Sequence, residues 1–314
     1  MTSDIKSLPS SYIFYLAFSA VLWITYIVLT FTAPINEATN IYHLSYSQLM
    51  WVKLSVVLPF FLIWIFGIFA ATGITRYIST IKGSPEEKGF AGIQSGVLVL
   101  LLGLTIGAVV GAIRSFLMDD ESARIILSVI VSYFNVLMPL IAFGYFFSGA
   151  TTLARLTKKP ISMLSNIVPL ILVLAAALFY AWVVFSNPDR QLGVGPQHTG
   201  ALYLPDEMIV LTLMVPYVTM WALGLFAAFR LLNYRNSVQG LIYRSALSWL
   251  TGGILFIILL SITFQGLALL RDFFAAADLK TILIAVYLIL AAIAVGYIFL
   301  WFGARKLRII ETVV

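Results

Sequence analysis

Long apolar stretches alternate with short polar segments along the whole 314-residue chain. A helix needs about 20 mostly apolar residues to cross the hydrocarbon core of a bilayer. Eight stretches are long enough, near residues 11–33, 50–73, 91–114, 124–150, 161–186, 207–230, 244–270 and 280–303. Because unpaired backbone groups in lipid cost several kcal/mol, each stretch is predicted to be an α-helix. The pattern therefore predicts an all-α, polytopic integral membrane protein with eight transmembrane helices.

The polar segments between these stretches leave little room for anything else. The longest run over residues 34–48 and 187–206, so no soluble domain is expected. The first apolar stretch is longer than the core of a signal peptide and no small-residue cleavage site follows it. We therefore expect it to be retained as a membrane span.

The sequence repeats itself at an offset of 157 residues. PFFLIWIFGIFAA at 59–71 matches PYVTMWALGLFAA at 216–228, and eight of the 26 positions in 58–83 are identical in 215–240. Five of the matched pairs are Pro59 with Pro216, Trp64 with Trp221, Gly67 with Gly224, Ala71 with Ala228 and Tyr77 with Tyr234. The repetition predicts an internal duplication of a four-span unit, over residues 1–157 and 158–314.

An even number of spans returns the chain to the side where it entered. The two units are then parallel, with the same orientation, and related by a pseudo-two-fold axis along the membrane normal. The residues kept in both copies are interpreted as structural, because small residues let helices approach closely in lipid.

Composition and charge agree with this picture. The chain is 61% hydrophobic and 10% charged, against about 25% charged in soluble domains. Thirteen of the 19 basic residues lie at one set of helix ends: Lys6, Arg76, Lys82, Lys88, Arg155, Lys158, Lys159, Arg230, Arg235, Arg244, Arg305, Lys306 and Arg308. The positive-inside rule predicts that these ends and both termini are cytoplasmic, and a plasma (inner) membrane location is expected. The net charge of +6 is thus a topology signal rather than a sign of nucleic-acid binding.

Four glycines mark the third predicted helix. Gly96, Gly103, Gly107 and Gly111 are spaced by 4 and 7 residues, which places them on one helical face. Such a glycine zipper favours close helix contact. The contact is either within the chain or with an oligomer partner.

The candidate ligand or lipid contacts are polar. Ser128, Ser132 and Asn135 form a stripe on the fourth predicted helix, and Arg114 and Arg271 end the third helix of each unit. The stripe either makes interhelical hydrogen bonds or lines a pocket. The two arginines either reach the interface and pair with nearby carboxylates or bind an anionic ligand or headgroup.

Catalytic chemistry is not predicted. The chain has no cysteine, and its two histidines, His43 and His198, fall in predicted loops. No charged residue lies near the middle of a predicted span, where proton relays and ion-coupled carriers usually need one. We therefore expect no catalytic residue, metal site or cofactor, and no enzyme activity.

Two functions remain from the sequence. The first is a non-catalytic membrane protein that acts by association, as a scaffold, assembly subunit or sensor component, with a homo-oligomer or membrane protein partner. The alternative is a permease or channel with a pathway near the pseudo-two-fold axis.

Overall fold

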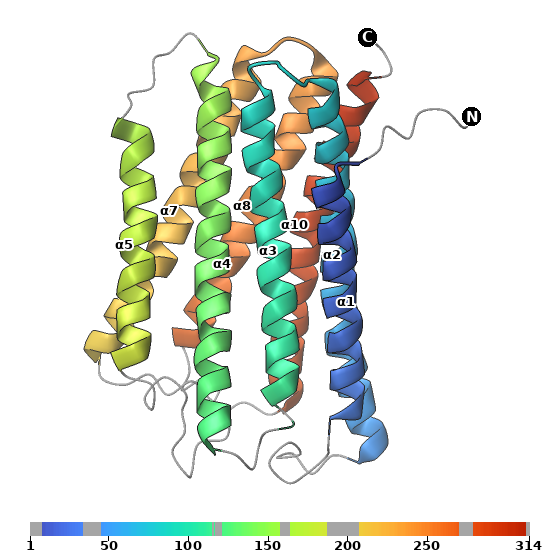
Figure 1. Cartoon of the computed structure of the whole chain (residues 1–314), viewed down its shortest axis with the longest axis vertical. Helices are drawn as coiled ribbons and strands as arrows, with labels where there is room; N and C mark the ends of the chain where they lie inside the picture. The colour runs from blue at the N-terminus through green and yellow to red at the C-terminus, as the bar shows by residue number, and fades with distance from the viewer. Residues whose placement is uncertain are drawn as a thin grey trace.

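A computed structural model of the chain describes residues 8–33, 45–114, 116, 121–157, 164–186, 207–269 and 279–311. Eight α-helices occupy these ranges (Figure 1). They are α1 (Ser10–Thr32), α2 (Tyr46–Thr80), α3 (Glu87–Arg114), α4 (Glu121–Arg155), α5 (Leu164–Ser186), α7 (Glu207–Ser237), α8 (Leu241–Leu269) and α10 (Leu279–Glu311). Each coincides with one of the predicted apolar stretches, so the all-helical prediction is confirmed.

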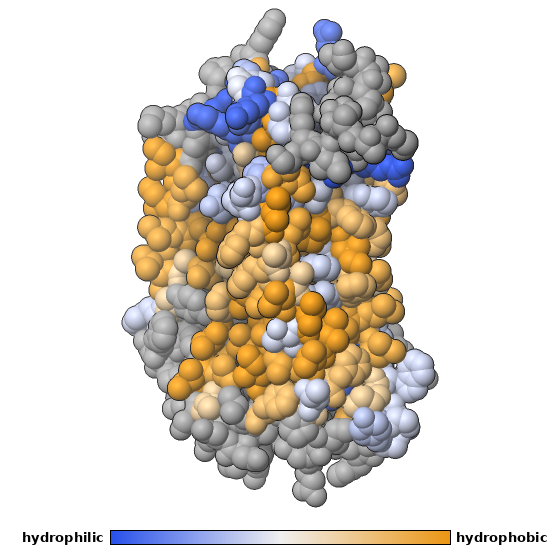
Figure 2. Space-filling view, turned by 45° about the vertical axis from the view of Figure 1, so that its right-hand side comes forward, coloured by the Kyte–Doolittle hydropathy of each residue, from blue (hydrophilic) through white to orange (hydrophobic). Residues whose placement is uncertain are grey.

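Membrane-spanning length is reached in seven of these helices. All except α5 contain a described apolar stretch long enough to cross a bilayer, and in α5 the apolar stretch Ile167–Phe179 is shorter. Figure 2 shows a broad hydrophobic band across the face in view, below an end where hydrophilic residues gather. The helices therefore indicate a membrane-embedded protein.

Local signals set the ends of α2 and α7. Ser45 and Gln48 form a capping box at the start of α2, in which the Ser45 N–H donates to Gln48 Oε1 at 2.9 Å. The turns after α2 and α7 contain Gly83 at φ +84° and Gly240 at φ +96°. Glycine adopts this left-handed conformation without steric cost, and the two glycines are 157 residues apart.

Six helices form a closed ring. Each contacts the next in the order α2, α3, α4, α7, α8, α10, and α10 contacts α2. The other two helices pack outside the ring on opposite sides of the bundle (Figure 1). Helix α1 packs against α3 and α2, whereas α5 packs against α7 and α4.

Most of the buried apolar side chains form one cluster drawn from both halves of the chain, and a smaller cluster of Trp23, Tyr26, Val57 and Val109 lies between α1, α2 and α3. Phe90 and Phe146 from the first half and Leu247 and Leu250 from the second are fully buried in the larger cluster. In lipid the hydrophobic effect gives little drive for helix association, so tight packing and interhelical hydrogen bonds hold such a bundle together.

Glycines bring α3 and α4 close. A Cβ on Gly92 would lie 2.8 Å from the Cα of Gly149, so the two backbones approach directly. A Cβ on Gly96 would lie 2.6 Å from the Phe146 ring, and one on Gly103 would meet Met138.

The predicted glycine face therefore divides along the length of α3. Gly96 and Gly103 face α4 of the same chain. Gly107 is also buried, but Gly111 is exposed and has open space around its Cα. Only the Gly111 end of this glycine face is therefore open to a contact with another chain.

Residues repeated at the 157-residue offset have matching surroundings. Ala71, Ala228, Tyr77 and Tyr234 are all buried. The remaining repeated residues behave alike in pairs: Pro59 and Pro216 lie inside α2 and α7, Trp64 and Trp221 are half-buried, and Gly67 and Gly224 are buried. Gly67 packs against Leu101, and Gly224 packs against Ile258, which is 157 residues after Leu101.

Candidate functional site

Helix α1 is held on α2 by specific polar contacts. Trp64 Nε1 donates to Ser19 Oγ at 2.6 Å, and the Tyr12 hydroxyl pairs with Thr72 Oγ1 at 2.8 Å. Ser19 is fully buried by this contact. Both polar groups of α1 therefore find their partners on one face of α2, which we call the α2 surface: Phe61, Trp64, Ile68 and Thr72.

The corresponding positions of α7 form a different surface. We call them the α7 surface: Val218, Trp221, Leu225 and Phe229, each 157 residues after its counterpart. Val218, Leu225 and Phe229 are 52%, 45% and 61% exposed, whereas their counterparts on α2 are half-buried beneath α1. Helix α5 packs on α7 and α4 but leaves Val218, Leu225 and Phe229 exposed.

Sequence differences between α1 and α5 explain why α5 does not take that place. At the 157-residue offset, Tyr12 of α1 corresponds to Pro169 of α5, and Ser19 corresponds to Ala176. Neither offers a hydroxyl, so α5 cannot make the two polar contacts that hold α1. Ala176 is instead buried at the contact that α5 makes with the ring.

Two buried indole N–H groups, Trp23 Nε1 on α1 and Trp221 Nε1 on α7, have no hydrogen-bond partner within the described residues. The counterpart of Trp221 Nε1 on Trp64 is paired with Ser19. A buried donor without an acceptor costs about 1–3 kcal/mol, and native proteins contain few of them. The α7 surface therefore combines exposed apolar side chains with an unsatisfied indole N–H.

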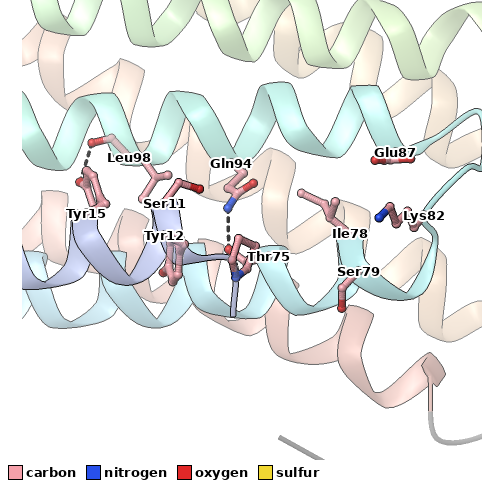
Figure 3. A pocket seen from close by; sticks show the side chains of 11 residues that line it. Ser11, Tyr12, Tyr15, Thr75, Ile78, Ser79, Lys82, Glu87, Gln94 and Leu98 are labelled. Atoms are coloured by element: carbon pink, nitrogen blue, oxygen red, sulfur yellow. Dashed lines mark hydrogen bonds between the residues drawn. The ribbon is translucent and has the colours of Figure 1, made fainter. Parts of the chain in front are cut away.

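A second candidate site is a cavity of about 540 Å³ between α1, α2 and α3. It lies at the end of the bundle where α1 begins and the α2–α3 turn closes. Its lining residues are Pro9, Ser11, Tyr12, Tyr15, Thr75, Ile78, Ser79, Lys82, Glu87, Gln94 and Leu98 (Figure 3).

The floor of this cavity is an ordered polar network. Gln94 Nε2 donates to Thr75 Oγ1 at 2.5 Å, and Thr75 Oγ1 donates to the carbonyl of Ala71 at 2.7 Å. The Tyr15 hydroxyl donates to the Leu98 carbonyl at 2.7 Å. Figure 3 shows Lys82 and Glu87 at the other end of the cavity, beside the turn.

Aromatic side chains join the two halves at the same end of the bundle. The Tyr234 and Tyr243 hydroxyls are 3.2 Å apart, and the Tyr77 and Tyr243 rings are 6.4 Å apart. Phe90 adds an edge contact to Tyr77 at 5.0 Å. These rings come from α2, α3, α7 and α8, and they fill the space between them.

Arg230, one of the basic residues at the predicted cytoplasmic helix ends, is half-buried. Its guanidinium lies 4.2 Å from the centre of the Phe147 ring and donates to Thr151 Oγ1. Gly73, its counterpart in the first half, packs against Ala304, which is 157 residues after Phe147.

The sequence-predicted ligand contacts lie outside what the structure describes. This applies to Arg271 and to the side chains of Arg114, Ser128, Ser132 and Asn135. No group of three or more potential metal ligands occurs within the described ranges.

Comparison with protein-family models, with curated proteins and with solved structures gave no match. The function of the chain must therefore be inferred from its own residues.

Proposed function

We propose that this chain is a non-catalytic membrane protein that acts by association, as a scaffold, assembly subunit or sensor component. The observation that carries the proposal is the difference between the α2 and α7 surfaces. The first is covered by α1 of the same chain, while the second exposes Val218, Leu225 and Phe229 and holds an unpaired indole N–H.

The chemistry of the partner follows from α1. A transmembrane helix that packs on the α7 surface covers Val218, Leu225 and Phe229. Trp221 Nε1 is buried within the chain, so the indole must turn outward before a serine or threonine hydroxyl of that helix can accept from it. In lipid such a contact gains from packing and from the hydrogen bond. The partner is a helix of another membrane protein or of a second copy of the chain.

The α2 and α7 surfaces can be compared because α2 and α7 hold matching positions in the proposed duplication. We propose that residues 1–157 and 158–314 are two parallel four-span repeats about a pseudo-two-fold axis along the membrane normal. Support comes from contacts repeated at the 157-residue offset, such as Gly67 on Leu101 and Gly224 on Ile258, and from the closed ring of six helices.

The orientation is part of the same proposal. Helix α1 begins and α10 ends at the same end of the bundle (Figure 1). Exposed basic residues such as Lys82, Arg244 and Arg305 lie at that end. By the positive-inside rule we place it, with both termini, in the cytoplasm, and we place the chain in the plasma (inner) membrane.

The alternative of a permease or channel near the axis has less support. At the basic end, Tyr77, Tyr234 and Tyr243 are packed together between the two halves. A pathway there requires these rings to move apart.

Photo-crosslinking in the native membrane tests the proposal. A benzophenone amino acid at Leu225 is expected to form an adduct with a protein, either another membrane protein or a second copy. The matched control is Ile24, which is 61% exposed on α1 and is expected to react with lipid. If the Leu225 probe forms lipid adducts alone, the association function is wrong.

A further inference from the structure

The cavity between α1, α2 and α3 has unused hydrogen-bonding groups beside an ordered floor. Thr75 and Tyr12 are buried and paired, so the floor keeps its shape without a ligand. By contrast, Ser11 Oγ, Gln94 Oε1 and Lys82 Nζ make no hydrogen bond or ion pair with any described residue. The cavity therefore offers a donor hydroxyl, an acceptor carbonyl and a cation to something that enters it.

Both signs of charge border the cavity. Lys82, in the turn after α2, supplies a cation. Glu87 supplies a carboxylate, one oxygen of which accepts the Gly83 N–H at 2.6 Å. The other carboxylate oxygen is left as an acceptor for a ligand that carries N–H or O–H groups.

The position of the cavity favours an amphiphile over a soluble ion. It lies where α1 begins, and Tyr15, Ile78 and Leu98 give it an apolar wall toward the hydrophobic band. A phosphate at Lys82 would then lie at the level of the lipid headgroups on the basic side, where anionic lipids attract basic residues.

We infer that this cavity binds the headgroup of a glycerophospholipid, with the phosphate at Lys82 and the donor groups of the headgroup at Glu87. Glycerol and ethanolammonium headgroups have such donors, and choline has none. The inference concerns the first half of the chain and does not depend on the association function proposed for α7.

Native mass spectrometry of the detergent-purified full chain tests it. Titration with dioleoyl phosphatidylglycerol or dioleoyl phosphatidylethanolamine is expected to give one saturable site, with either lipid at least fivefold tighter than dioleoyl phosphatidylcholine. The two donor lipids identify which headgroup is preferred. Equal affinity for the choline lipid overturns the inference, as does displacement of the bound lipid by millimolar inorganic phosphate, which would mark a site for a free anion.

Variants link the site to the cavity. Lys82→Gln is expected to weaken binding about fivefold, the effect of removing one cation near the headgroups. Lys88→Gln is the control, because Lys88 is exposed at the same end of the bundle but does not line the cavity. An equal loss in both variants means general attraction to lipid and contradicts the inference.

Two further measurements keep the test decisive. Glu87→Ala removes the carboxylate that would accept from the headgroup and is expected to abolish the preference over phosphatidylcholine. A benzophenone amino acid at Ser11 is expected to form an adduct with added phosphatidylglycerol. An adduct with residues 1–7 of the same chain instead would show that the chain itself fills the cavity, and would overturn the inference.

Discussion

The two repeated tryptophans should respond to different extents to the same substitution. Trp64→Phe and Trp221→Phe each keep an aromatic ring and remove one indole N–H. In Trp64 that group donates to Ser19, whereas in Trp221 it has no acceptor within the described residues. The pair therefore separates the loss of a hydrogen bond from the loss of ring volume, which is common to both variants.

The size of the difference follows from Ser19. This residue is fully buried, so Trp64→Phe leaves its hydroxyl without the indole, at a cost of about 1–3 kcal/mol for a buried polar group. Two effects reduce that figure. A helical serine can donate to the carbonyl one turn back, and measured interhelical hydrogen bonds in membranes average about 0.6 kcal/mol. We expect Trp64→Phe to be less stable than Trp221→Phe by about 1 kcal/mol.

Equilibrium unfolding of the purified chain in mixed micelles, followed by circular dichroism, measures this difference. A double-mutant cycle of Trp64→Phe with Ser19→Ala should give a coupling free energy of about 0.6 kcal/mol or more, while Trp221→Phe combined with Ser19→Ala should be additive. Equal destabilisation by the two tryptophan substitutions would refute the asymmetry between the α2 and α7 surfaces.

Three further predictions concern packing. Gly92→Ala should destabilise the chain by about 1–3 kcal/mol, because its Cβ would meet the backbone of α4. Gly111→Ala has open space around the added Cβ and should be neutral or up to about 1 kcal/mol stabilising. The same unfolding assay compares the two variants, and equal effects would contradict the packing described here. Gly83→Ala and Gly240→Ala should each lower the free energy of unfolding by about 1–2 kcal/mol, since alanine is strained at their positive φ. Thermal unfolding measures this loss, and unchanged midpoint temperatures would contradict the prediction. Arg230→Met removes the cation–π contact and the hydrogen bond of Arg230, and it should lower the free energy of unfolding by about 1–2 kcal/mol. Thermal unfolding in detergent measures this change. A more stable variant would show that these contacts do not compensate for burying the charge.

Helix number and position could be predicted from the sequence because length and apolarity decide them in a bilayer. Gly96 and Gly103 recur on one face, so the sequence predicts a close helix contact there, but it leaves open whether the contacted helix belongs to the same chain. The different places of α1 and α5 were not foreseen, although Ser19 and Ala176 stand at matching positions and carry the signal. This difference becomes meaningful only when Trp64 is known to face Ser19, and the sequence does not show which residues of two helices are in contact.

The cavity between α1, α2 and α3 could not be predicted for a similar reason. Thr75 and Gln94 lie on different helices and look like isolated polar residues in the sequence. The sequence directed attention instead to the stripe of Ser128, Ser132 and Asn135. Its side chains lie outside the described residues, so its role stays a prediction.

The most direct test of the association function is native mass spectrometry of the protein released gently from its own membrane. The wild-type chain is expected to carry a stoichiometric partner, either a second copy or another membrane protein. Val218→Trp, which places a bulky side chain on the α7 surface, should lose that partner, while Val21→Trp on the exposed face of α1 should keep it. A wild-type chain that appears only at its own mass of 34.7 kDa would contradict the association function.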